Sequence, residues 1–118
     1  MSDGKREWNG ETVRTWLQSR FEAARSEQDR AINRRDREDD YDVAAAEEWV
    51  CQIAKTNVAT DDQDRFAAFL KQLLEKDDYR CTGIYDERRF DRAVRTYLRK
   101  LIKMAKANEG FEKLSRYQ

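Results

Sequence analysis

The stretch RRFDRAVRTYLRKLIKMAK, from Arg88 to Lys106, decides the fold class of this protein more clearly than any other part of the chain. Its apolar side chains return every three or four residues for five turns, which is the spacing of one face of an α-helix. The sequence therefore predicts a long amphipathic helix here. The predicted apolar face consists of Phe90, Ala93, Val94, Tyr97, Leu98, Leu101, Ile102 and Ala105.

Both ends of this helix carry residues typical of helix termini. Asp86 is a natural N-cap, and Tyr85 and Phe90 stand at the two positions of a hydrophobic staple. At the other end, Gly110 stands where a C′ glycine would end the helix, and Phe111 is placed to fold back on it.

A first helix is predicted to begin after the N-cap Asn9, with Trp8 and Val13 in staple positions. Residues 1–8 are expected to be flexible. Beyond Ala24 the apolar face thins, so residues 25–42 form either a charged helical extension or a linker. The absence of glycine and proline there favours the helix. The face of this helix is Val13, Trp16, Leu17, Phe21 and Ala24.

Two more helices are predicted in the middle of the chain. Residues 43–57 form one, and the next begins at Thr60, where TDDQ fits a capping box closed by Gln63. A connection over residues 77–85, with a turn at Gly83, leads to the last helix. The two apolar faces are Val43, Ala46, Trp49, Val50, Ile53 and Ala54, and Phe66, Phe69, Leu70, Leu73 and Leu74.

These patterns predict an all-α protein, a single-domain antiparallel bundle of about four helices over residues 1–118. The chain has no proline, four glycines and 41% charged residues, a composition that suits long helices better than sheets. Thirteen aromatic residues argue against disorder. Short connections between helices with one apolar face each favour antiparallel neighbours.

Charge is distributed unevenly although the net charge is zero. Residues 36–64 hold ten acids and two bases, a local charge of −8, whereas residues 79–118 hold eleven bases and five acids, a local charge of +6. Such segregation concerns partners and association rates, not the fold. No run of about 20 apolar residues is present, and two cysteines form no disulfide framework, so we expect a cytoplasmic protein without membrane insertion.

The last predicted helix carries a row of bases, which we call the basic ridge, opposite its apolar face. At 100° per residue these side chains fall within about 80° of arc over roughly 27 Å. Such a row can dock an acidic partner or follow a phosphate backbone. It can also be a solvated face, or be neutralised by acids of the same chain. The ridge consists of Arg88, Arg92, Arg95, Arg99, Lys103 and Lys106.

The acidic segment is the second candidate surface. Its side chains could meet a basic partner or imitate phosphates, or they could only favour helix N-termini. The spacing of a calcium loop fails because a glycine and a glutamate are missing from their positions. The candidate acidic patch consists of Asp39, Asp40, Asp42, Glu47 and Glu48.

Sequence patterns of enzymes are absent. The chain has no histidine, which removes the commonest general base and metal ligand. Cys81 is followed by an arginine seven residues later, which misses the CxxxxxR phosphatase spacing, and no glycine-rich phosphate loop occurs. We therefore predict no catalytic residue, no cofactor and no metal site.

The sequence thus favours a non-enzymatic binding protein, an adaptor or inhibitor, that engages a macromolecular partner through its acidic and basic faces. A protein is the favoured partner, and a component of nucleic-acid-handling machinery is the narrower form of this hypothesis. Direct nucleic-acid binding through the basic ridge is the alternative.

Overall fold

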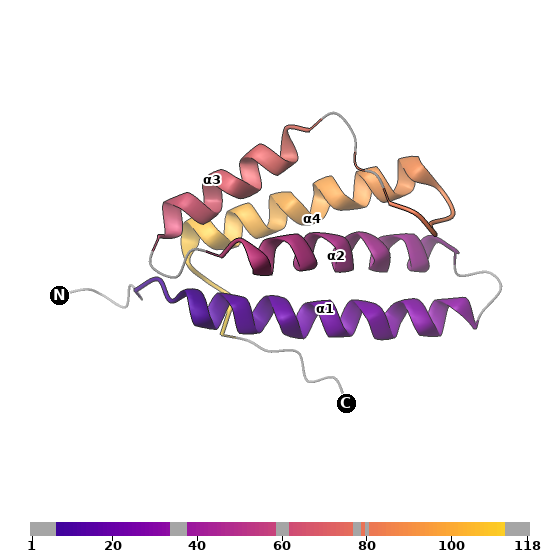
Figure 1. The fold of residues 1–118 in the computed structure, drawn as a ribbon, viewed down its shortest axis with the longest axis horizontal. Helices are drawn as coiled ribbons and strands as arrows, with labels where there is room; N and C mark the ends of the chain where they lie inside the picture. The colour runs from indigo at the N-terminus through magenta and orange to yellow at the C-terminus, as the bar shows by residue number, and fades with distance from the viewer. Residues whose placement is uncertain (1–6, 34–37, 59–61, 77–78, 80, 113–118) are drawn as a thin grey trace.

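The fold is described from a computed structural model, which describes residues 7–33, 38–58, 62–76, 79 and 81–112. Four helices make up most of these residues, and no strand occurs among them: α1 (Gly10–Ile32), α2 (Glu38–Thr56), α3 (Gln63–Leu74) and α4 (Glu87–Ala107) (Figure 1). The predicted all-α fold class is confirmed.

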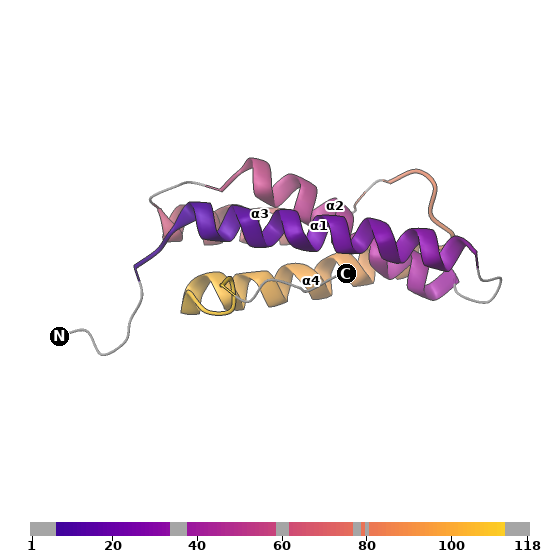
Figure 2. The same cartoon turned by 90° about the horizontal axis from the view of Figure 1, so that it is seen from below.

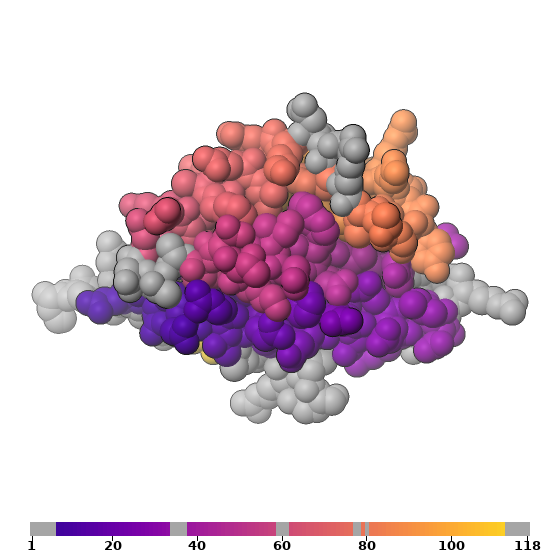
Figure 3. All heavy atoms as spheres, in the orientation of Figure 1, coloured from indigo at the N-terminus to yellow at the C-terminus, as the bar shows by residue number. Residues whose placement is uncertain are grey.

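Consecutive helices run in opposite directions, and each packs on a neighbour through its apolar face. α1 lies against α2, α2 against α4, and α4 against α3. In the view of Figure 2, α1 lies in front, α3 lies largely behind it, and α4 runs below them. In the space-filling view of Figure 3, α1, α2 and α3 cover one face, and little of the C-terminal end of α4 is visible.

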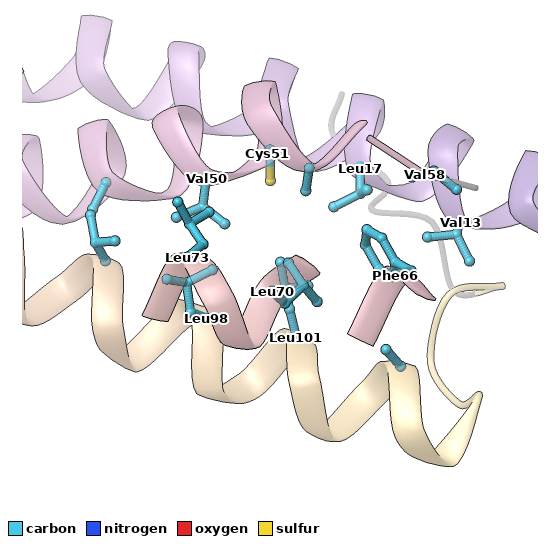
Figure 4. Close-up of a cluster of buried hydrophobic side chains, with 14 of the residues drawn as sticks. Val13, Leu17, Val50, Cys51, Val58, Phe66, Leu70, Leu73, Leu98 and Leu101 are labelled. Carbon is cyan, nitrogen blue, oxygen red and sulfur yellow. The ribbon is translucent and has the colours of Figure 1, made fainter. Parts of the chain in front are cut away.

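One connected core holds the four helices together. Figure 4 shows side chains from all of them converging on the same space. Leu17, Val50, Leu70 and Leu101 come from α1 to α4 in turn, and none is more than 1% exposed. Burial of such side chains is the main favourable contribution to folding.

Two helix starts agree with the sequence prediction. Asn9 accepts a hydrogen bond from the Thr12 amide at 3.2 Å, and Asp86 accepts from the Arg88 and Arg89 amides at 2.9 and 3.1 Å. Trp8, the last residue of the stretch 1–8 that was expected to be flexible, packs on the core, with its ring 5.8 Å from that of Phe66. Residues 1–6 lie outside the described part.

The predicted start of α3 is wrong. Its N-cap is Asp62, whose Oδ1 accepts from the Arg65 amide at 2.9 Å. Gln63 does not close a capping box; its side chain donates to the Ala105 carbonyl at 2.7 Å. The later start brings Gln63 to the open carbonyls at the end of α4, which need donors. Thr60 lies outside the described residues.

The end of α4 also differs from the prediction. The residue in the left-handed conformation directly after the helix is Asn108, with φ 52°, and Gly110 follows with φ 95°. Asparagine tolerates this conformation better than most residues do. Phe111 folds back as expected: it is buried, with its ring 5.4 Å from that of Trp16.

The charged stretch 25–42 divides between two helices. α1 continues to Ile32, so the helical alternative holds up to that residue, and residues 38–42 are the first turn of α2. Residues 34–37 lie outside the described part. α2 begins five residues earlier than predicted, and its buried face differs from the predicted one: Val43 is 52% exposed and Asp42 is fully buried.

No helix in the described residues has the length and apolar character that crossing a membrane requires.

Candidate functional site: a basic cleft beside α4

Most of the basic ridge faces solvent without a counter-charge. The helix spacing places its side chains on the side of α4 away from Leu98 and Leu101. Within the described residues, four of its members are exposed and form neither an ion pair nor a side-chain hydrogen bond. These are Arg88, Arg92, Arg99 and Lys103.

Arg95 differs from its neighbours and corrects the predicted ridge. Its guanidinium donates to the backbone carbonyls of Leu74 at 3.1 Å and Lys76 at 2.9 Å, and pairs with Asp91 at 2.9 Å. It also lies 4.9 Å from the centre of the Tyr79 ring. A cation at the end of α3 satisfies carbonyls that the helix leaves open. Arg95 therefore joins α3 to α4. Its guanidinium is occupied by these contacts, whereas the prediction had it open to a partner.

The ridge opens onto a cleft of about 1210 Å³ that the sequence did not predict. Trp49 and Tyr79 form part of its wall, with their rings edge to face at 5.4 Å. Four arginines against Glu87 and Asp91 leave the lining with a charge of two positive. The described lining residues are Trp49, Tyr79, Cys81, Thr82, Glu87, Arg88, Asp91, Arg92, Arg95 and Arg99.

The far end of the ridge meets a base from another helix. Lys106 lies beside Lys71 of α3, and the nearby Lys71 side chain, by competing for a shared proton and by charge repulsion, lowers the pKa of the Lys106 ammonium. Two exposed lysines therefore stand side by side at this end of α4.

The acidic patch is not a continuous surface, and Asp42 in particular corrects the prediction. Asp42 is 0% exposed and accepts hydrogen bonds from the Tyr85 and Asp86 amides at 2.8 and 2.9 Å. The guanidinium of Arg89 donates to it at 3.0 Å. A carboxylate with three donors is well satisfied inside a protein. Asp42 therefore anchors the start of α4 and cannot meet a partner.

Other acids of the patch also pair within the chain. Glu47 pairs with Arg20 at 2.8 Å, and Glu48 pairs with Arg25 at 3.3 Å, both across the α1–α2 interface. Asp39 is exposed and pairs with Arg89 at 3.1 Å. Asp40 is exposed as well.

The partners of these acids answer one question that the sequence left open. Acids of α2 pair with Arg20 and Arg25 of α1 and with Arg89, which lies on α4 outside the ridge. In the described part of the chain, none of these pairs involves a ridge residue. The pairs of Asp39, Asp42, Glu47 and Glu48 in the described residues therefore leave the ridge without a counter-ion from these four acids.

The two thiols are poorly suited to nucleophilic chemistry. Burial raises the pKa of the Cys51 thiol to about 12, and Cys51 Sγ lies 3.6 Å from the Tyr97 hydroxyl. Burial also raises the pKa of Cys81, and the nearby Glu48 and Asp42 raise it further. The thiolate is the reactive form, so both residues are held in the less reactive state. No group of three potential metal ligands lies together among the described residues.

Several contributors to this site were missed at the level of sequence. Trp49 stood at the edge of its predicted stripe, a sign of partial exposure, and it is half-buried. Asp42 stands four residues before Ala46, on the line continued by Val50 and Ala54, which could have revealed that it points inward. No local signal placed Tyr79 or Thr82 beside α4.

Comparison of the chain with protein-family models, curated proteins and solved structures finds no match.

Proposed function

We propose that this chain is a non-enzymatic binding protein, an adaptor or inhibitor, that engages an acidic protein partner through the basic ridge of α4. The observation that supports this most is that the acids of α2 pair with other bases and leave Arg88, Arg92 and Arg99 unpaired within the described residues. Arginine forks bind carboxylates in a two-pronged geometry and suit such an interface.

The contact between Lys71 and Lys106 adds support. Two neighbouring ammonium groups repel each other, and an anionic partner on this end of the ridge would relieve that repulsion. The proposal assigns no catalytic role, since the chain has no histidine and both thiols have raised pKa values. A cytoplasmic location belongs to the proposal too, supported by two free cysteines.

Affinity capture of the tagged chain from its own cells tests the proposal. The ridge variant Arg88→Glu/Arg92→Glu/Arg99→Glu is compared with Arg30→Glu/Arg65→Glu/Lys100→Glu, which makes the same change in net charge at exposed positions outside the ridge. We expect an acidic protein to be recovered with wild type and the control variant, with or without nuclease, and to be lost with the ridge variant.

Two results would contradict the proposal. Recovery of the same protein with the ridge variant would remove the ridge from the interface. Loss of the partner after nuclease treatment, with tight and steeply salt-dependent binding of a free oligonucleotide, would establish direct nucleic-acid binding instead. In that case the slope of log affinity against log salt should flatten by roughly 0.7–0.9 for each phosphate contact removed.

A further inference from the structure

The cleft beside α4 combines unpaired cations with an aromatic wall, which is more than a charged surface offers. We propose that it binds an extended acidic segment of the partner protein, with carboxylates on Arg88, Arg92 and Arg99 and one apolar side chain against Trp49. This inference rests on the proposed function and specifies where and how the partner is held.

The geometry of the cations suits a short extended segment. Arg88 and Arg99 are eleven residues apart on α4, a rise of about 16 Å. An extended chain advances about 3.3 Å per residue, so about five residues span that distance. Arg88 and Arg92 are separated by about 6 Å along the axis, close to the spacing of alternate residues in such a chain.

The cleft wall is held rigid from within, which favours a preformed site. Tyr79 is buried, and its hydroxyl donates to the Leu73 carbonyl at 2.7 Å. Arg95 lies over the Tyr79 ring and is fixed by carbonyls at the end of α3. Trp49 packs edge to face on Tyr79 and on Phe90. A partner would not have to order these side chains, so less conformational entropy opposes its binding.

The lining favours a peptide over a nucleic acid. Glu87 and Asp91 alternate with the arginines in the same cleft, and they would repel a chain that carries a phosphate at every step. A peptide can place neutral residues beside them. The Tyr79 ring already has Arg95 on it, so the described part of the wall offers no free pair of aromatic faces for successive bases.

A synthetic peptide of nine residues, in which four acidic residues alternate with four serines and a central leucine, tests the proposal, with central serine as the matched control. Binding is followed by the indole N–H signals of the three tryptophans in nitrogen-15 NMR spectra. We expect the signal of Trp49 to shift and those of Trp8 and Trp16, which pack on Phe111, to stay in place. The leucine peptide should bind about tenfold more tightly, since leucine leaves water on binding.

Two variants of the exposed lining separate the cleft from the ridge. Thr82→Trp should fill the cleft and weaken the leucine peptide to the level of the serine peptide. Glu87→Gln removes an acid from the lining and should strengthen binding about threefold, whereas Glu27→Gln, an equal charge change on α1, should have no effect.

The outcomes distinguish the two proposals. Equal binding of both peptides, with shifts along α4 but none at Trp49, would overturn the cleft and leave the ridge as the proposed interface. Failure of both peptides to bind would overturn both. Tighter binding of a single-stranded oligonucleotide than of either peptide, with a shift at Trp49, would show that the cleft takes nucleic acid.

Discussion

Asp42 shows how one buried carboxylate fixes the relation between two helices. Among the described residues it is the one charged side chain that is fully buried, and it bonds two amides at the start of α4 and the guanidinium of Arg89. Both carboxylate oxygens have donors: Oδ1 accepts from the Tyr85 amide, and Oδ2 accepts from the Asp86 amide and Arg89. Removing the carboxylate would leave Arg89 and two backbone amides without this hydrogen-bond acceptor. Donors that lack an acceptor away from water lower the stability of the fold.

We expect Asp42→Ala to lower the free energy of unfolding by about 3–5 kcal/mol, because it breaks a buried ion pair. Asp39→Ala is the control, since Asp39 pairs with the same arginine from an exposed position and should cost less than about 1 kcal/mol. Urea unfolding followed by circular dichroism measures both. If both variants lost the same free energy of unfolding, the burial of Asp42 would not explain how much this residue contributes to stability.

Cys51 provides a pH dependence of stability. The folded thiol has a pKa of about 12 because it is buried, whereas an unfolded cysteine has a pKa of about 8.5. Between these values the unfolded chain releases the proton and the folded chain keeps it. The contribution of the protonated Cys51 thiol to the free energy of unfolding is therefore complete below about pH 8.5 and is lost as the pH rises toward 12.

Wild type should consequently lose stability faster than Cys51→Ala above about pH 9, by up to about 1.4 kcal/mol per pH unit. Urea unfolding of both proteins at several pH values between 7.5 and 10.5 gives the comparison. The alanine variant is expected to be less stable at pH 7.5 because it leaves a small cavity. Parallel pH profiles would contradict a raised thiol pKa.

At the scale of the elements, α3 is the shortest helix, and α4 stabilises both of its ends. Gln63, at the start of α3, donates to carbonyls at the C-terminal end of α4. Arg95 of α4 donates to carbonyls at the C-terminal end of α3. Twelve residues are too few for an isolated helix to be stable in water. Packing and these end contacts therefore decide whether α3 forms.

Arg95→Gln should lower the free energy of unfolding by about 1–3 kcal/mol, through loss of charge-assisted bonds to two carbonyls. Arg92→Gln on the same helix makes the same charge change at an exposed position and should stay within about 0.5 kcal/mol of wild type. Chemical denaturation measures the difference. If both changes cost the same, Arg95 does not act as a cap for α3.

The apolar face of α4 yields another prediction at this scale. Leu101 is 0% exposed in the core shared by the four helices, so Leu101→Ala should cost about 2–5 kcal/mol. Thr96→Ala, on an exposed position of α4, should change stability by no more than about 0.5 kcal/mol. A loss at Leu101 within the error of the measurement would contradict the packing of α4 against the core.

At the scale of the whole molecule, the core is one connected cluster to which every helix contributes. Circular dichroism and tryptophan fluorescence should therefore report the same midpoint of thermal unfolding, since no helix has a separate core to retain. The ridge variant Arg88→Glu/Arg92→Glu/Arg99→Glu should unfold in one transition as well, because these side chains are exposed. Two separated transitions would show that part of the bundle folds independently.

Across the whole molecule, the basic residues fall into two sets. One set forms ion pairs with acids of the same chain, and the other is exposed to solvent. Arg20, Arg25 and Arg89 pair with acids of α2, whereas Arg88, Arg92 and Arg99 form no ion pair within the described residues. Adjacent residues Arg88 and Arg89 fall on different sides, because successive residues of a helix are about 100° apart. One face of α4 therefore joins the bundle and the other stays exposed to solvent.

The sequence by itself determined the fold class, the helix caps at Asn9 and Asp86, and the apolar face of α4. These features depend on contacts within a few residues, and helical periodicity makes them visible in the order of the amino acids. The start of α3 was predicted two to three residues too early. Asp62 and Thr60 are both possible N-caps, and which of them caps the helix depends on contacts with α4.

Only the tertiary structure decided which charges are paired. Asp42 and Arg89 are 47 residues apart in the sequence, far more than a local motif spans. Their pairing follows from the packing of α2 on α4. The cleft likewise joins Trp49 of α2 and Tyr79 of a connecting segment to the arginines of α4. A charged side chain carries no local mark of its partner, because ion pairs tolerate many sequence separations and depend on where helices meet in space.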